Sequence, residues 1–173
     1  MRSHISCGGS AGCRVDAPIL SDGAAAREDG DPRRRVLGTL ARARIDELEA
    51  VWQDWETQPA VRTLRGPEIG LVMTRGRVGG GGAPFNIGEV TMTRAVVQLG
   101  GGEVGFGHCL GRSGRKALLV ATFDALWQTA ERDRVEERLV APVARRLAEA
   151  VLKKDRQTAA TRVNFFTLVR GED

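Results

Sequence analysis

The sequence predicts an α+β fold: a four-stranded antiparallel sheet with N-terminal and C-terminal helices packed on it. Apolar residues recur at helical spacing before residue 59 and again after residue 113. Between residues 61 and 110, β-branched and aromatic residues alternate with polar ones, and glycines interrupt the runs. Helices on both sides of a block of strands are typical of a helical layer covering one face of an antiparallel sheet.

The first helical segment is expected to begin after Asp31 and Pro32, because aspartate is a good N-cap and proline suits the first helical position. Its apolar residues predict one long helix or two in tandem: Leu37, Ala41, Ile45, Leu48, Trp52 and Trp55. Pro59 ends the pattern, since a proline inside a helix removes a hydrogen-bond donor and clashes with the preceding turn.

The four strands are expected at residues 61–65, 70–78, 89–99 and 103–110, with a turn at Gly66-Pro67 and a glycine hairpin loop at residues 100–102. Strand side chains alternate between faces. One face of the last strand therefore carries Val104, Phe106, His108 and Leu110, and the other carries Gly105, Gly107 and Cys109. The nearly bare glycine face predicts close contact with a helix, a neighbouring strand or another chain.

Two further helices are expected after the sheet. Ser113 is the predicted N-cap of the first, whose apolar stripe is Leu119, Phe123, Leu126, Trp127 and Ala130. Asp133 with Glu136 predicts a capping box that opens the second, and Pro142 predicts a kink in it. Asp124 and Glu131 lie off the stripe, which predicts that both are surface residues.

The expected organisation is a disordered tail at residues 1–30 and a single α+β domain at residues 31–173. The tail is rich in Gly, Ser, Ala and Asp and holds few large apolar groups, so it cannot offset the entropy of ordering. The three cysteines show no C-x-x-C spacing, which favours a reducing, cytoplasmic location. No segment has the length of a membrane span or the apolar core of a secretory signal.

A basic loop is the candidate anion-binding site. The chain has 26 Lys and Arg against 22 Asp and Glu, a net charge of +4 that favours anionic partners. Arg112, Arg115 and Lys116 lie between a strand end and a helix start, where backbone N–H groups and the helix dipole can hold a phosphate. The G-x-x-x-x-G-K-[ST] spacing of a P-loop is absent, and such a loop can also be basic for solubility alone.

Other chemistry finds little support in the residues. His108 and Cys109 are adjacent on a strand, so their side chains point to opposite faces and cannot form a nucleophile–base pair. With only His4 besides, no metal site is predicted. No catalytic residue is therefore assigned.

The carboxyl terminus is the candidate partner interface. Residues 163–169 form a dense apolar run that is too short to fold alone, so it closes this domain's core or inserts into a partner. Phe165 and Phe166 face opposite ways if extended, so one of them requires a second surface. Arg162 and Arg170 flank them, and aromatic residues and arginine are enriched at binding hot spots.

Two segments carry a family resemblance: residues 88–95 (GEVTMTRA) and residues 162–171 (RVNFFTLVRG). Residues 70–72, the glycine loop at 79–82, Gly111-Arg112 and residues 140–142 follow the same order. Over residues 33–171 the chain resembles the PhnG family, the G subunit of the bacterial carbon–phosphorus lyase core complex. The N-terminal tail is longer than the resemblance predicts, and residues 113–116 replace what in relatives can be a differently charged loop.

The resemblance implies an accessory subunit of a multi-subunit enzyme. Its partners would be the H, I and J subunits, chiefly the I subunit, in a two-fold symmetric core. ATP and an alkylphosphonate would be substrates of that complex, which displaces adenine from ATP to form a ribose 1-phosphonate 5-triphosphate. The resemblance implies no cofactor on this chain and no activity of the chain alone. Neither nucleic acid nor a membrane is expected as a partner.

The alternative from a different class is a small basic nucleic-acid-binding α+β protein. It depends on the pI of about 9.5, on Arg33-Arg34-Arg35 and on the basic loop. Against it, the chain has no tyrosine and no recognised DNA or RNA motif, and acids are interleaved with the bases along its helices. An independent small enzyme is weaker still, because no activated nucleophile or acid–base pair is apparent.

Overall fold

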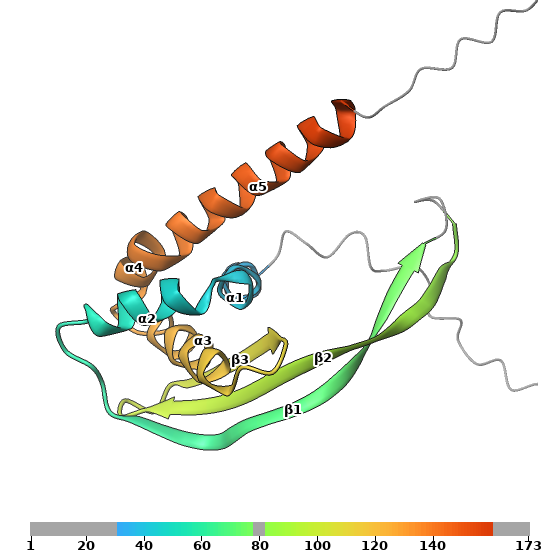
Figure 1. Ribbon diagram of the computed structural model, residues 1–173. Helices are drawn as coiled ribbons and strands as arrows, with labels where there is room; N and C mark the ends of the chain where they lie inside the picture. Colours follow the sequence, from blue (N-terminus) through green and yellow to red (C-terminus); the bar gives the residue numbers. More distant parts are fainter. Residues whose placement is uncertain (1–30, 78–81, 161–173) are drawn as a thin grey trace, which may run out of the picture. The chain divides into compact units, whose positions relative to one another are not determined.

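The computed structural model describes residues 31–77 and 82–160 as helices packed against one antiparallel sheet (Figure 1). The order along the chain is α1 (Pro32–Arg42), α2 (Ile45–Gln53), β1 (Val61–Arg77), β2 (Pro84–Leu99), β3 (Val104–Leu110), α3 (Gly114–Leu126), α4 (Arg132–Val135), a π-helical turn η2 (Glu136–Val140) and α5 (Ala141–Ala160). This confirms the predicted α+β class. The predicted tail at residues 1–30 lies outside the described residues and stays a prediction.

The described part of the sheet has three strands, in the order β1-β2-β3, and the prediction of four was wrong. The two segments predicted before and after Gly66-Pro67 are one strand, β1. Its pairing with β2 shifts register between Thr63 and Arg65 and again between Arg65 and Glu68. Gly66-Pro67 therefore forms part of a bulged stretch and not a turn. An edge strand tolerates a proline at such a bulge, because the missing N–H interrupts no inner ladder.

The hairpin between β2 and β3 forms where it was predicted. Gly102 has φ +102°, a conformation that suits glycine, and its N–H donates to the carbonyl of Leu99 at 2.9 Å. Burial alternates along β3 as expected: Gly105, Gly107 and Cys109 are buried and Phe106 and His108 are exposed.

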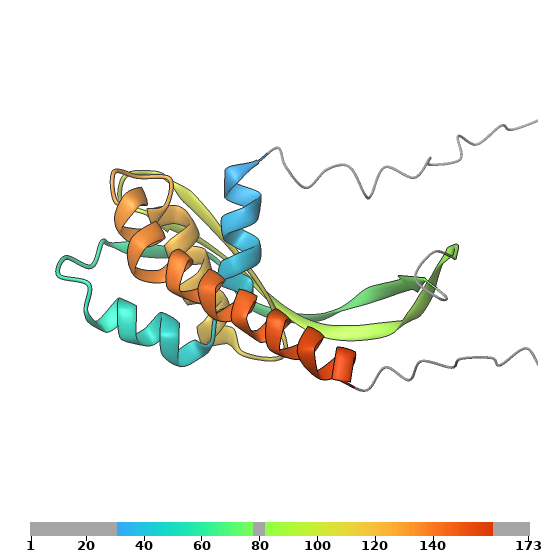
Figure 2. The ribbon, with the colours of Figure 1, turned by 90° about the horizontal axis from the view of Figure 1, so that it is seen from above.

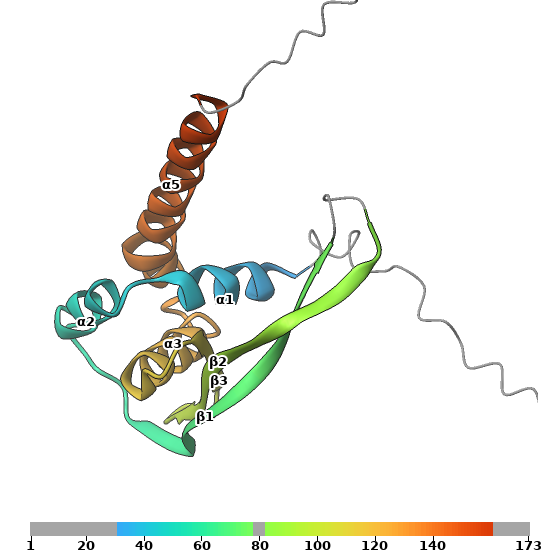
Figure 3. The same cartoon turned by 45° about the vertical axis from the view of Figure 1, so that its right-hand side comes forward.

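Helix α3 covers the glycine face of β3, as Figures 1 and 3 show. A Cβ at Gly105 would lie 1.9 Å from the carbonyl oxygen of Ala121, and a Cβ at Gly107 would lie 1.9 Å from that of Ala117. The two glycines thus let the helix backbone approach the strand closely. The glycine face was predicted to contact a helix, a neighbouring strand or another chain, and the structure shows that it contacts the chain's own helix α3. This face therefore gives no evidence for a partner chain.

The first helical segment is two helices in tandem, the second of the predicted alternatives. In α1 the buried apolar residues are Val36 and Leu40, while the predicted Leu37 and Ala41 are only half-buried. The buried stripe is therefore displaced by one residue. Further along, Leu48 and Trp55 are buried as predicted, whereas Ile45 is exposed.

The sequence predicted a cap for α3, and a capping box and a kink in the helical segment that follows it. Ser113 caps α3, since its Oγ accepts the N–H of Lys116 at 3.3 Å. The capping box predicted for Asp133 and Glu136 does not form, because Glu136 accepts the indole N–H of Trp127 at 2.9 Å. The π-helical turn lies immediately before Ala141 and Pro142, so the regular helix is interrupted close to the predicted kink.

The core lies between the sheet and the helices above α3, and Figure 2 shows these helices from above. Phe123 of α3 is fully buried, and the rings of Trp52 and Trp55 meet it edge to face at 6.0 and 5.9 Å. Because α3 is packed between β2 and β3 on one side and α1 and α2 on the other, it is buried nearly all round. This explains its mostly apolar sequence.

Candidate anion-binding loop and interface

The basic loop is held firmly at the junction between β3 and α3. The N–H of Gly111 donates to the carbonyl of Thr91 at 2.8 Å, and the hydroxyl of Thr93 donates to the carbonyl of Gly111 at 2.7 Å. Gly111 has φ +93°, which favours glycine at this position. The loop geometry is therefore fixed by the sheet beside it.

The three cations predicted to bind an anion have different surroundings. The Nε atom of Arg115 lies 3.2 Å from Oε1 of Glu49 on α2, in an exposed ion pair. The Nζ atom of Lys116 donates to the carbonyl of Ala41, near the end of α1, at 2.8 Å. Two of the three side chains thus help to hold α1 and α2 against α3.

Arg112 is exposed, and within residues 31–77 and 82–160 no hydrogen bond or ion pair engages its guanidinium. The first turn of α3 beside it is crowded on one side, because a Cβ at Gly114 would lie 2.9 Å from Cβ of Pro67. Arg112 is therefore the predicted anion contact that the fold engages least, and the role of all three cations stays a prediction.

A buried carboxylate, Asp124, was missed from the sequence and wrongly placed on the surface. It is fully buried on α3 and accepts two hydrogen bonds from Arg33 of α1, from Nε at 2.9 Å and from Nη2 at 2.7 Å. It also accepts the backbone N–H of Phe106 at 2.9 Å. These contacts satisfy the carboxylate and join α1, α3 and β3. The available signal was a single charged residue within the mostly apolar stretch 117–126 of α3.

A second carboxylate, that of Glu47, joins α2 to α5. Glu47 of α2 accepts hydrogen bonds from Nε and Nη2 of Arg146 on α5, at 2.6 and 3.0 Å, and from the backbone N–H of Arg44 at 2.8 Å. Burial acts to raise the pKa of Glu47, but these hydrogen bonds and the two arginine charges together hold the pKa below its usual range. The ion pair is therefore maintained at neutral pH.

His108 and Cys109 lie on opposite faces of β3, which confirms that they cannot act as a pair. His108 is exposed, while Cys109 is 1% exposed beneath α3. Burial raises the pKa of the Cys109 thiol, although the nearby charge of Lys116 acts to lower it. The neutral thiol packs as a small apolar group.

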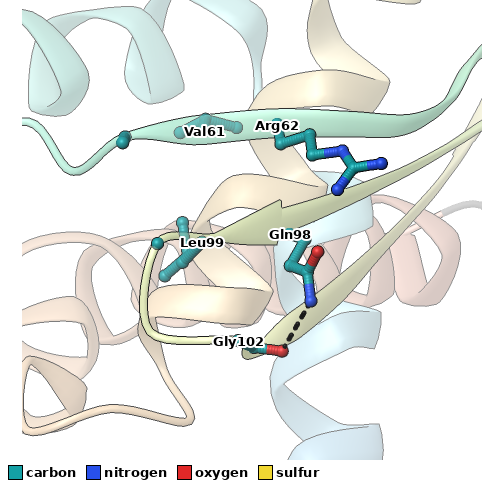
Figure 4. Close-up of a pocket in the computed structure, with 7 residues that line it drawn as sticks. Val61, Arg62, Gln98, Leu99 and Gly102 are labelled. Carbon is teal, nitrogen blue, oxygen red and sulfur yellow. Dashed lines mark hydrogen bonds between the residues drawn. The ribbon is translucent and has the colours of Figure 1, made fainter.

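Shallow pockets lie along the sheet. One of them, about 320 Å³, is at the β2–β3 hairpin, where Arg62 and Gln98 come from neighbouring strands (Figure 4). The side-chain amide of Gln98 donates to the carbonyl of Gly102 at 3.2 Å. A second pocket of about 270 Å³ includes Glu68 and Arg94. Both are open to solvent, and neither encloses a group of catalytic side chains.

The predicted partner-interface residues Arg162, Phe165, Phe166 and Arg170 lie outside the described residues, so their role stays a prediction. In the part of the chain that the structure describes, no three His, Cys, Asp or Glu side chains cluster as metal ligands would. The described helices include none that is long and apolar enough to cross a membrane.

Comparison with known proteins places the chain in a family. Residues 31–171 match the family described as "Phosphonate metabolism protein PhnG". A relative from Rhizobium meliloti (strain 1021), "Alpha-D-ribose 1-methylphosphonate 5-triphosphate synthase subunit PhnG", is 48% identical over 159 residues, which are 92% of this chain and 99% of the relative. The match covers the sheet, α3 and the loop between them. The chain belongs to the PhnG family of phosphonate metabolism proteins.

Proposed function

We propose that the chain is the G subunit of a ribose 1-methylphosphonate 5-triphosphate synthase and acts within that complex. The observation that carries this proposal is the 48% identity to a synthase subunit over nearly the whole of both chains. A likeness that takes in 92% of this chain and 99% of the relative favours a shared role in the same kind of complex. Its proposed role in the complex is accessory, as the family resemblance implies, and no catalytic residue is assigned to it.

The complex transfers an alkylphosphonate onto C1 of the ribose of ATP. The phosphonate oxygen forms the new bond to C1, and the bond to adenine breaks, so that adenine leaves and the triphosphate is kept. The H, I and J subunits are the proposed partners, with the I subunit the chief one. ATP and the alkylphosphonate are substrates of the whole assembly in the cytoplasm, and the chain itself holds no cofactor.

Co-expression tests the proposal directly. The chain is produced with the H, I and J subunits of the same organism, and the mixture is separated by size-exclusion chromatography. We expect the chain to elute with its partners, and we expect adenine release from ATP and methylphosphonate to require it. A chain that elutes alone, with adenine release unaffected by its omission, contradicts the proposal.

Within this function, Arg112 is the proposed contact for an anionic substrate group, a triphosphate or a phosphonate, supported by its exposure at the start of α3. We expect Arg112→Ala to lower the rate of adenine release by about tenfold or more, because a charge-assisted hydrogen bond contributes on the order of 1.5–3 kcal/mol. Assembly should be unaffected. Arg34→Ala, at an exposed arginine of α1, is the control. An unchanged rate of adenine release for Arg112→Ala rules the contact out.

The nucleic-acid alternative gives the opposite forecast. It expects the isolated chain to bind DNA or RNA with an affinity that falls steeply as salt rises, since phosphate contacts release counterions. Under the proposal above, the isolated chain shows no such binding at physiological ionic strength. Titration of a labelled oligonucleotide at two salt concentrations separates the two.

A further inference from the structure

The face of the sheet opposite α3 carries none of the described helices (Figure 1). Cross-strand partners share a face, so the register identifies which side chains it presents. Met92 pairs with Leu110, Val96 with Phe106, and Val72 with Val90. These positions alternate with Thr93, Ala95 and Val97, which are buried under α3. We call the side opposite α3 the outer face.

The outer face is more apolar than a solvent-facing sheet requires. Such faces normally carry polar side chains that alternate with the buried set. Here it includes Val72, Val90, Met92, Val96, Val104, Phe106 and Leu110. Phe106 is 40% exposed and Leu110 is 70% exposed. The other five are half-buried, and a row of charged residues divides this apolar surface in two. Exposed apolar side chains gathered on one face of a sheet are typical of an interaction site.

A charged belt crosses the same face between the apolar groups. Glu68 of β1 lies beside Arg94 of β2, which lies beside His108 of β3. Glu68 is 2.9 Å from Arg94 and 3.6 Å from Arg65, so one carboxylate faces two guanidinium groups. Arg62, the register partner of Gln98, adds a further cation at the hairpin end. The belt is therefore cationic.

The charge of the belt limits what can cover it. A cation that is removed from water needs a carboxylate nearby, because its desolvation is otherwise uncompensated. Glu68 can neutralise only one of the arginines Arg62, Arg65 and Arg94. Whatever covers the outer face must therefore bring apolar side chains for Phe106 and Leu110, and carboxylates for the remaining arginines.

We propose that the outer face docks an acidic, apolar-centred surface of a partner subunit of the synthase, an inference that rests on the proposed function. Apolar contact at Phe106 and Leu110 supplies the area, and the arginines of the belt set the orientation of the partner. Of the helical layer, Arg33 of α1 reaches the edge of this surface, with its guanidinium carbon 5.7 Å from the centroid of the Phe106 ring.

Paired substitutions test the surface in the full chain. Leu110→Arg and Arg62→Glu each weaken binding to the purified H, I and J subunits by roughly tenfold or more, as measured by titration of the labelled chain. Ile45→Arg, at a 39% exposed position on α2, is the control and leaves the affinity unchanged. Both altered outer-face positions are exposed, so thermal unfolding of the free chain should match that of the wild type.

Thiol labelling tests the same surface without disturbing it. Leu110→Cys, in a chain with Cys7→Ser and Cys13→Ser, reacts with a maleimide when free and is protected in the complex, whereas Ile45→Cys stays reactive in both. The proposal is overturned if Leu110→Arg and Arg62→Glu both bind with wild-type affinity and Leu110→Cys is labelled equally in the free chain and in the complex. It is also overturned if Ile45→Arg loses as much affinity as the two outer-face variants. Wild-type chain that binds no subunit defeats the proposed function instead. If an oligonucleotide protects Leu110→Cys from the maleimide and the H, I and J subunits do not, the outer face binds nucleic acid and the proposal is also overturned.

Discussion

Asp124 shows how one buried charge organises the helical layer. It is 0% exposed, while the Arg33 side chain that binds it is 30% exposed, so the carboxylate depends on that guanidinium for most of its stabilisation. Removing one partner of a buried pair leaves an uncompensated charge, which costs more than the pair contributes relative to apolar residues. The pair therefore fixes where α1 lies against α3 and β3.

We expect Arg33→Met to lower the free energy of unfolding by about 3 kcal/mol or more, because Asp124 would be left buried with only the Phe106 N–H. Arg35→Met is the control: Arg35 is 72% exposed and lies 3.7 Å from Glu136, and its loss should cost under about 1 kcal/mol. Urea unfolding of both variants measures the difference. Adding Asp124→Leu to Arg33→Met should recover part of the loss, and equal losses for the two single variants would contradict this account.

Glu47 makes the stability of the chain depend on pH. Its pKa is lowered in the folded chain, so its ion pair with Arg146 stabilises the fold above the ordinary pKa of a glutamate. That contribution is lost as the pH falls through the lowered value. We expect Glu47→Gln to cost about 1–2 kcal/mol at neutral pH and almost nothing below the lowered pKa. Chemical unfolding across acidic pH measures this, and a cost that does not change with pH would contradict it.

At the scale of elements, contact between α3 and β3 depends on the absence of two side chains. A Cβ at Gly107 would lie 1.9 Å from the backbone oxygen of Ala117, which has no flexible end that can move aside. We expect Gly107→Ala to push the helix from the strand and to cost about 3 kcal/mol or more.

Gly70→Ala is the matched control for Gly107→Ala, since a Cβ at Gly70 would meet nothing within 4 Å and the residue lies in the same sheet. It should change the free energy of unfolding by under about 1 kcal/mol. Thermal and urea unfolding of the two variants give the comparison. Similar stability of both would mean that the close packing of α3 on β3 contributes little.

Local patterns predicted the elements well and their environment less well. The two faces of β3, the Ser113 cap and the glycine hairpin followed from the period of a strand and the chemistry of single residues. Gly66-Pro67 was interpreted as a turn, because a bulge and a turn use the same residues and only the partner strand distinguishes them. The burial of Asp124 was missed for a similar reason: α3 is covered on two sides, which its own sequence does not reveal.

The candidate site was predicted only in part. Ser113 and Gly111 place the basic loop where the sequence indicated, but the sequence could not tell which cations were already engaged. Arg115 is paired with Glu49 and Lys116 is bonded to Ala41, each more than sixty residues away along the chain. Such long-range partners depend on the packing of helices, so only the folded structure separates Arg112 from its neighbours.

At the scale of the whole molecule, two segments extend beyond the packed core. Strands β1 and β2 continue past β3 as a two-stranded arm, residues 71–77 and 84–91, in which Leu71 and Ile87 are each 64% exposed. In α5 every residue from 148 to 159 is exposed. A two-stranded ribbon and a helix end without tertiary contacts are both marginally stable in water.

Amide hydrogen exchange should therefore divide the free chain into two classes. We expect the amides of α3 to exchange slowly, near the rate set by global unfolding, and those of the arm and of residues 148–159 to exchange far faster through local opening. If the partner subunits cover these segments, their exchange should slow by roughly tenfold or more in the assembled complex, because covered hydrogen bonds open less often. Helix α3 serves as the internal control, since it is already buried in the free chain. Fast exchange of the arm and of residues 148–159 in the complex would show that both extend into solvent even there, and would leave the part of the outer face that lies outside the arm as the surface through which the subunit is held.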